Sequence, residues 1–226
     1  LIMLVLVLQT DGRTGVAKTG ECLNLSHSAF ATAPGGITFS GDRDDLSLPY
    51  CNPALLRGSM HNDISLSFST WFAGITYGHA SWAVDTDRRG TIAAGVSFIS
   101  YGRFTEADIA GNITGTFTAA EYAFSAAWSL QLDSSFTVGI ALKPVFSHLE
   151  RYFSAGICTD IGATWSSRKL LLDAGVVIRN AGFQIKSHTG RGGEPLPLEI
   201  IAGVTKRLAH APFSFSPTHS HLEKPD

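Results

Sequence analysis

The sequence predicts an all-β protein, and within that class a transmembrane antiparallel β-barrel. Large apolar residues alternate with small or polar ones over long segments, of which 122–132 and 136–146 are the clearest. Successive side chains of a strand point to opposite faces, so each segment has one large apolar face. The other face carries Gly, Ala, Ser and Thr more than Lys and Glu, and the segments are long enough to cross a bilayer when tilted. A soluble sandwich or barrel with the large residues turned inward stays open as the alternative.

The composition excludes several other classes. Of the 226 residues 16% are charged, and the formal net charge is −2. Such a chain lacks the basic face that nucleic-acid binding needs, so no nucleic-acid partner is expected. No apolar run approaches the ~20 residues of a membrane-spanning helix. Three widely spaced cysteines, without a Cys-x-x-Cys pair, indicate neither a zinc site nor a disulfide framework.

The first residues predict a targeting segment. The run 1–8 is apolar, and the chain turns polar at Gln9. Such a run is too short to span a bilayer but suits the apolar middle of a secretory signal peptide. We therefore expect 1–20 to be a partial signal peptide and leader, with its start missing. An ordinary buried strand is the alternative.

The phase of the alternation assigns faces in the two clearest strands. In a membrane barrel the lumen would be lined by Ser125, Ser129, Thr137 and Gly139, and a change at Gly139 would carry a smaller solvation penalty than Ile140→Arg. The residues expected to face lipid are Tyr122, Phe124, Trp128, Leu130, Phe136, Val138, Ile140 and Leu142. Further strands are expected at 91–99 and 153–165, and weaker ones at 63–72, 74–84, 170–179, 197–206 and 212–219.

The connections between the expected strands differ in length. The segments 85–90, 133–135 and 166–169 predict short turns, whereas 102–116 and 181–196 predict long loops. Outer-membrane barrels have short periplasmic turns and longer extracellular loops, so 102–116 is expected outside the cell. A loop that folds over the barrel mouth is the alternative. The candidate partner-binding residues in this loop are Phe104, Glu106, Asp108 and Asn112.

No catalytic or metal-binding constellation is visible in the sequence. The eight histidines are scattered, and only His219 and His221 form a close pair. The G-x-S-x-G pattern of a hydrolase nucleophile is missing, and no glycine-rich loop leads into a helix to hold phosphate. We therefore expect a protein that is not an enzyme and that has no catalytic residue, cofactor or metal.

The order of short motifs from residue 23 onward resembles the PorQ family. These proteins are outer-membrane β-barrels of the bacterial type IX secretion system, related to PorV and to FadL-like fatty-acid channels. Each motif is weak alone, but together they extend over nearly all of the chain after residue 23. The matching segments are LNL at 23–25 with SA at 28–29, NPALL at 52–56, MHN at 60–62, GITYG at 74–78, YGRFTEAD at 101–108, GNITG at 111–115, FTAAEYAF at 117–124, LKP at 142–144, SHLERY at 147–152, RNAG at 179–182, EPLP at 194–197 and LAHAPF at 208–213.

The resemblance implies a fold. It would be a FadL-like barrel with a short plug or hatch at 21–62 and barrel strands over 63–226, and the residues from 23 to 34 can form a short helix in the plug. The chain departs from the family at Ser26 and Phe30, where the family tends to have Pro and Arg. Family members also continue for several more strands, so this chain is expected to be a fragment that lacks the C-terminal strands and cannot close its barrel.

The resemblance also implies a location and a role. The protein would lie in the bacterial outer membrane, in contact with lipid, as a non-enzymatic component of type IX protein secretion, gliding and cell-surface attachment. It would anchor a surface partner, PorZ, of the complex that attaches secreted cargo. A channel for small apolar molecules is the alternative from the related fatty-acid barrels, and a soluble all-β enzyme or binding module is the third hypothesis.

Overall fold

The structure is a computed structural model that describes residues 20–25, 27–28, 44–108, 110, 112–150, 152–187, 196–208, 214–220 and 222. The strands are β1 (Ile64–Thr70), β2 (Thr76–Asp85), β3 (Thr91–Ala107), β4 (Ile113–Gln131), β5 (Phe136–Leu149), β6 (Tyr152–Ser167), β7 (Leu172–Lys186), β8 (Glu199–Arg207), β9 (Ser214–Phe215) and β10 (Thr218–His219). The short 3-10 turns are η1 (Glu21–Leu23), η2 (Leu48–Tyr50), η3 (Pro53–Leu55), η4 (Gly58–Met60), η5 (Phe72–Gly74) and η6 (Asp87–Arg89). Among the described residues, no helix has the length and apolar character needed to cross a bilayer.

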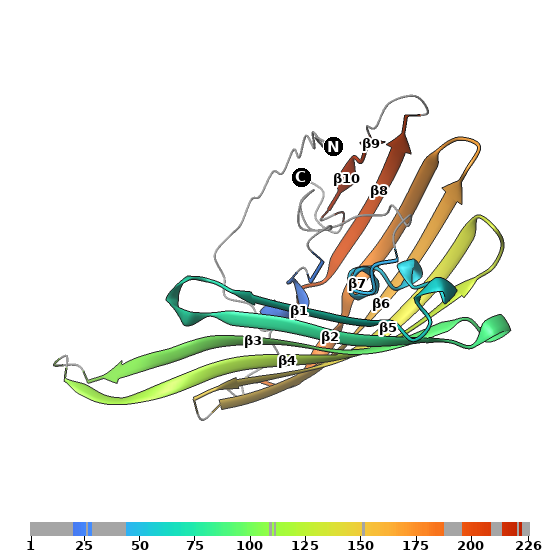
Figure 1. Cartoon of the computed structure of the whole chain (residues 1–226). Helices are drawn as coiled ribbons and strands as arrows, with labels where there is room; N and C mark the ends of the chain where they lie inside the picture. Colours follow the sequence, from blue (N-terminus) through green and yellow to red (C-terminus); the bar gives the residue numbers. More distant parts are fainter. Residues whose placement is uncertain are drawn as a thin grey trace.

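The strands form one antiparallel sheet that curves into a trough (Figure 1). From β1 to β8 each strand pairs with the next one along the chain, and β9 and β10 both pair with β8. Over the described residues the sheet is not closed, because β1 lies at one edge and β10 at the other. The predicted all-β, antiparallel class is therefore confirmed, and so is the expected lack of closure.

The strands lie where the alternation predicted them, but three of them, β3, β4 and β7, extend well beyond their predicted ends. β3 continues to Ala107 and β4 begins at Ile113, so the predicted long loop 102–116 is wrong and is instead a β-hairpin. β7 continues to Lys186 through the first part of the predicted loop 181–196. In the described part of the weak strand predicted at 212–219, which begins at Ser214, the structure has β9 and β10.

Both errors have the same cause, which is a β-bulge that shifts the phase of the alternation. The pairing of β3 with β4 slips between Ser100 and Arg103, where Gly102 has a φ of 80°. The pairing of β6 with β7 slips between Thr159 and Ile161, beside Asn180, which has a φ of 55°. An inserted residue moves the later side chains to the opposite face. The alternating pattern in the sequence is therefore interrupted at each bulge, and the predicted strand ends there although the real strand continues.

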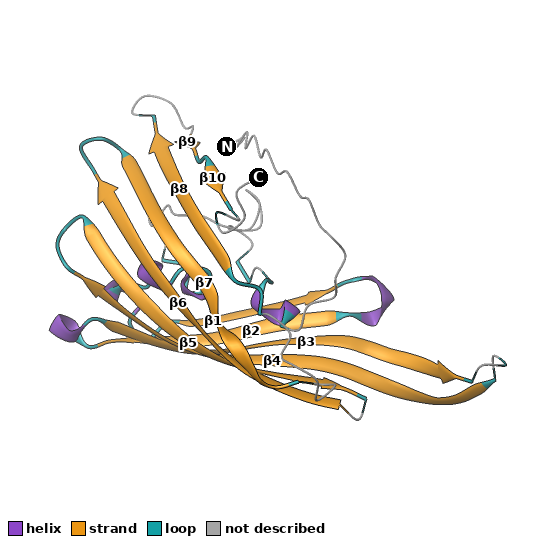
Figure 2. Ribbon diagram, turned by 180° about the vertical axis from the view of Figure 1, so that it is seen from behind, coloured by secondary structure: helices purple, strands orange, loops and turns teal. Residues whose placement is uncertain are grey.

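The N-terminal turns lie against the concave side of the trough (Figure 2). η1 contacts β3 and β4, and η3 contacts β4, β5 and β6. We call residues 20–25, 27–28 and 44–60 the inner segment. Of the helix predicted at 23–34, the described residues 23–25 and 27–28 include only the end of the turn η1, and residues 26 and 29–34 lie outside the described part of the chain. Residues 1–19 of the signal peptide and leader predicted at 1–20 lie outside it as well.

Candidate functional site

Large apolar side chains cover the outer, convex face of the sheet. Tyr122, Phe124 and Trp128 of β4 are 45%, 48% and 39% exposed. Ile140 and Leu142 of β5 are exposed on the same face. The remaining predicted lipid-facing residues, Leu130, Phe136 and Val138, are half-buried. The outward direction of these side chains is thus found in the structure, while their contact with lipid stays a prediction.

Aromatic residues gather at two levels of the outer face. Towards the end with the β3–β4 turn, cross-strand pairs join Phe98 to Tyr122 and Tyr122 to Phe146. Phe146 also stacks on Phe153, with ring centroids 6.2 Å apart. Towards the opposite end stand three of the four tryptophans, Trp82, Trp128 and Trp165. Two aromatic levels that flank an apolar band are typical of membrane barrels.

The inner, concave face is made of small residues. Ala123 and Ala127 of β4 and Ala141 of β5 are buried beneath or beside the inner segment. Two of the predicted lumen-lining residues, Ser129 and Gly139, are buried on this face. The other two, Ser125 and Thr137, are half-buried.

A pair of glycines makes room for η3. Gly139 of β5 and Gly162 of β6 are direct cross-strand partners. A Cβ on Gly139 would lie 2.4 Å from the carbonyl carbon of Pro53, and one on Gly162 would lie 2.0 Å from the side-chain oxygen of Asn52. η3 therefore rests directly on the backbone of the sheet. A side chain at Gly139 would meet the main chain of η3, so a substitution there carries a packing cost in addition to any solvation penalty.

Hydroxyl groups on the inner face of the sheet hydrogen-bond to the main chain of the inner segment. Ser129 donates to the carbonyl of Leu56 at 2.7 Å, and Thr164 donates to that of Ala54 at 3.3 Å. These side chains satisfy carbonyls that the short 3-10 turns leave without a partner.

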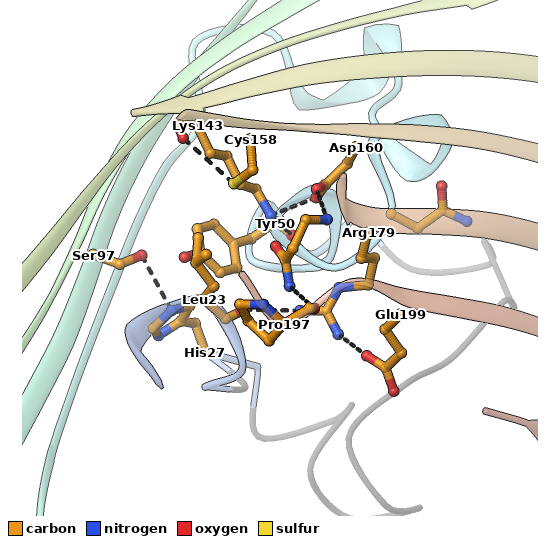
Figure 3. Close-up of polar contacts among 12 residues, drawn as sticks. Leu23, His27, Tyr50, Ser97, Lys143, Cys158, Asp160, Arg179, Pro197 and Glu199 are labelled. Atoms are coloured by element: carbon orange, nitrogen blue, oxygen red, sulfur yellow. Dashed lines mark hydrogen bonds and ion pairs between the residues drawn. The ribbon is translucent and has the colours of Figure 1, made fainter. Parts of the chain in front are cut away.

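Lys143, on β5, connects the sheet to the inner segment through an ion pair and a hydrogen bond (Figure 3). Its side chain is fully buried, and its ammonium lies 2.5 Å from the carboxylate of Asp160 on β6. The ammonium also donates to the carbonyl of Tyr50 at 2.8 Å and lies 4.0 Å from the centre of that ring. Asp160 accepts the backbone N–H of Asn180 at 2.7 Å. The β7 bulge therefore presents a main-chain donor to a buried carboxylate.

Arg179 and Glu121 make the same kind of contact with η1. Arg179 of β7 is buried, donates to the carbonyl of Leu23 at 3.0 Å and pairs with Glu199 of β8 at 3.2 Å (Figure 3). Glu121 of β4 is also buried and accepts the backbone N–H of Cys22 at 3.1 Å. Burial, and then the neighbouring Glu121, raise the pKa of the Cys22 thiol. We call Glu121, Lys143 and Arg179 the charged clamps.

A cluster of rings lies between the inner segment and β2–β3. His27 stacks on His79 with ring centroids 4.5 Å apart, and Tyr50 meets His27 edge-on at 4.7 Å. The hydroxyl of Ser97 lies 2.8 Å from Nδ1 of His79 and 3.1 Å from Nε2 of His27. Burial, and then the charge of a protonated His79 and of Lys143, lower the pKa of His27 to about 3. His27 is therefore neutral at neutral pH.

The charged clamps and the two wall-side hydroxyls of Ser129 and Thr164 all contact main-chain atoms, so the inner face of the sheet is suited to binding a peptide main chain.

The void between η2 and the sheet, beside Tyr50 and Lys143, has a volume of about 20 Å³, enough for about one water molecule. Cys22, Cys51 and Cys158 are buried free thiols. Within the described part of the chain, no three or more His, Cys, Asp or Glu side chains are grouped to hold a metal ion.

The predicted partner-binding residues lie on the β3–β4 hairpin, and two of them hold its turn. Asp108 accepts the backbone N–H of Asn112 at 2.8 Å and its side-chain N–H at 3.0 Å. Phe104 and Glu106 lie on β3 with exposed side chains. That these residues bind a partner stays a prediction.

The contacts that Glu121, Lys143, Asp160 and Arg179 make on the inner face were not predicted from the sequence, although the positions of these residues gave an indication. Glu121, Lys143 and Asp160 are charged residues at small-face positions within alternating strands. A buried charge requires a partner, so three of them on the inner face indicate a covering element that carries polar groups. Arg179 gave a weaker signal because the bulge follows it directly.

No family model matches the chain, and no curated protein matches it.

Proposed function

We propose that the chain is a non-enzymatic β-barrel protein of the bacterial outer membrane that serves the type IX secretion system by anchoring a surface partner. The observation that supports the membrane location is the two-faced sheet. Large apolar side chains cover its outer face, and the small inner face is covered by the chain's own N-terminal turns. A soluble barrel would turn its large side chains inward, where here alanine, serine and glycine predominate.

The filled trough favours an anchor over a channel for small apolar molecules. A fatty-acid channel requires an apolar pocket inside the barrel. The void beneath η2 is about 20 Å³ and is lined in part by His79 and Lys143. A larger groove of about 300 Å³ is lined mainly by outer-face residues of β1–β3, including Leu66, Phe68 and Phe98. The apolar space thus lies where the proposal places lipid.

The role in type IX secretion and the PorZ-like partner rest on the motifs that resemble the PorQ family. The test is fractionation of cells that express the tagged full-length protein, followed by purification of the surface complex. We expect the protein in the carbonate-resistant outer-membrane fraction, with the PorZ-like partner bound. An unrelated tagged outer-membrane barrel is the control for non-specific capture. Recovery in the soluble periplasmic fraction would contradict the membrane location, and recovery in the membrane without the partner would contradict the anchor role.

A further inference from the structure

The tip of the β3–β4 hairpin extends beyond the rest of the sheet. β3 pairs with β2 only as far as Ser100, and β4 pairs with β5 only from Ala119 onward. Residues 103–107 and 113–118 therefore form ladder pairs only with each other; the β5–β6 turn adds a bond from the N–H of Glu150 to the carbonyl of Thr118. We call these two segments the rim ribbon. Both views show it projecting past the neighbouring hairpins (Figures 1 and 2).

The bulge at the base of the rim ribbon gives it two unlike faces. Gly102 takes a φ of 80°, and a Cβ there would lie 3.3 Å from the carbonyl oxygen of Gly74. Beyond this bulge Phe104 pairs with Phe117, which continues the inner phase of Glu121. Phe104 therefore lies on the inner side, although the even-numbered residues of β3 before the bulge lie on the outer face. The other face carries Arg103, Thr105, Thr116 and Thr118.

This change of face marks the end of the apolar band. Along the outer face of β4, Phe124 and Tyr122 are followed by Thr118 and Thr116. Threonine and arginine side chains favour water or headgroups over hydrocarbon. The rim ribbon therefore stands beyond the part of the barrel that the proposed function places in lipid.

The inner-side face of the rim ribbon carries uncovered apolar surface beside a carboxylate. Phe104 and Phe117 stack with centroids 5.1 Å apart, and Phe104 is 41% exposed. The carboxylate of Glu106 lies over Gly115, with one oxygen 3.2 Å from the position of a Cβ there, and no ion pair joins it to another described residue. A lone two-stranded ribbon is marginally stable, and exposed apolar surface with a polar rim is typical of a protein contact.

We propose that the Phe104–Phe117 face of the rim ribbon docks a segment of a second protein that presents an apolar side chain next to a lysine or arginine. The apolar side chain covers the stacked rings, and the cation pairs with Glu106, which supplies the charge complementarity. This inference rests on the proposed function, because it takes the rim ribbon to lie outside the membrane.

The test is photo-crosslinking in intact cells that express the full-length protein. The photoreactive residue p-benzoylphenylalanine is placed at position 117, on the docking face, or at position 116, on the opposite face. We expect one discrete protein adduct from 117 and little from 116, with a lysine or arginine in the cross-linked peptide. Glu106→Lys should lower the yield at 117 about tenfold. Reversing the charge of the identified cation in the partner should restore it.

Three results would overturn the docking proposal: adducts with lipid or with the chain's own barrel only, equal adducts from both positions, or no effect of Glu106→Lys. A separate measurement tests the topology on which it rests. Thr116→Cys should react with a membrane-impermeant maleimide on intact cells, against a low background because the native cysteines are buried. Labelling without a protein adduct rejects the docking and keeps the membrane location, whereas lack of labelling rejects both.

Discussion

The two faces of β5 are held by different kinds of contact. On the outer face, Ile140 lies opposite Trp128 and Ile161, and both Ile140 and Leu142 are exposed, so what matters there is apolar character. Lys143 and Gly139 on the inner face meet particular main-chain atoms of the inner segment. The outer face is thus defined by hydrophobicity and the inner face by individual atoms. Substitutions on the two faces should therefore fail for different reasons.

The largest expected effect comes from removing one partner of the buried ion pair. Lys143→Met leaves the Asp160 carboxylate buried without its cation, which should lower the free energy of unfolding by about 3–5 kcal/mol. Urea unfolding in detergent micelles, followed by tryptophan fluorescence, measures this loss. The matched control is Lys143→Met combined with Asp160→Leu, which removes both charges and should cost much less. If the double variant is as unstable as the single one, the unpaired charge is not the cause.

The outer face should reject a charge only within the apolar band. Ile140→Arg places a cation near the middle of the proposed membrane and should cost about 2–4 kcal/mol of folding stability in the bilayer. Thr116→Arg puts the same side chain on the outer face of the rim ribbon, where the cost should be about 0–1 kcal/mol. Refolding titrations into lipid vesicles give both values. Equal costs would place the band boundary elsewhere.

Acid should weaken the docking of the inner segment through His27. The pKa of His27 is about 3 in the folded protein against 6.5 in the unfolded chain. Between these two pH values the unfolded chain binds a proton at His27 and the folded protein does not. The stabilising effect is complete above pH 6.5 and is lost as the pH falls towards 3. At pH 4.5 the loss should reach about 2–3 kcal/mol.

The measurement for His27 is the rate at which a protease cuts the inner segment at pH 7.5 and at pH 4.5. His27→Gln removes one of the two stacked histidines and should reduce this pH dependence, with His79 contributing what remains. A variant with the slope of the natural protein would show that another group is responsible.

The smallest expected effect comes from filling the space beneath η3. Gly139→Val should displace the inner segment and cost about 1–3 kcal/mol through overpacking. Limited proteolysis should then cut between residues 44 and 60. Gly115→Val is the control, because its Cβ would meet only the movable Glu106 side chain. Resistance of the Gly139 variant to proteolysis would mean that η3 can move aside without undocking.

How far the sequence predicted the structure differs between these regions. The strands and their outward faces followed from alternation, because each reflects the average character of many residues, such as Tyr122, Phe124 and Trp128. The bulges at Gly102 and Asn180 did not follow, because one inserted residue changes the phase and leaves no mark in composition.

The charged clamps could not have been predicted as a group. Glu121, Lys143 and Arg179 are far apart in the sequence, and their common target is main-chain atoms, which no residue type identifies. The role of the glycine pair could not have been predicted either. Gly139 and Gly162 look like two of many small inner residues until η3 is placed on them.

The charged clamps also set an order of assembly. Cys22 contacts a residue 99 positions later, Tyr50 one that is 93 positions later, and Leu23 one that is 156 positions later. Closing such long loops is slow, because the chain entropy is lost before the contacts form. The inner segment precedes all of these strands in the chain, so its set of clamps is complete only when β7 is in place. A chain truncated before Arg179 should therefore leave residues 44–60 more open to proteases than the full chain does, and the completion of docking should be a late event of folding.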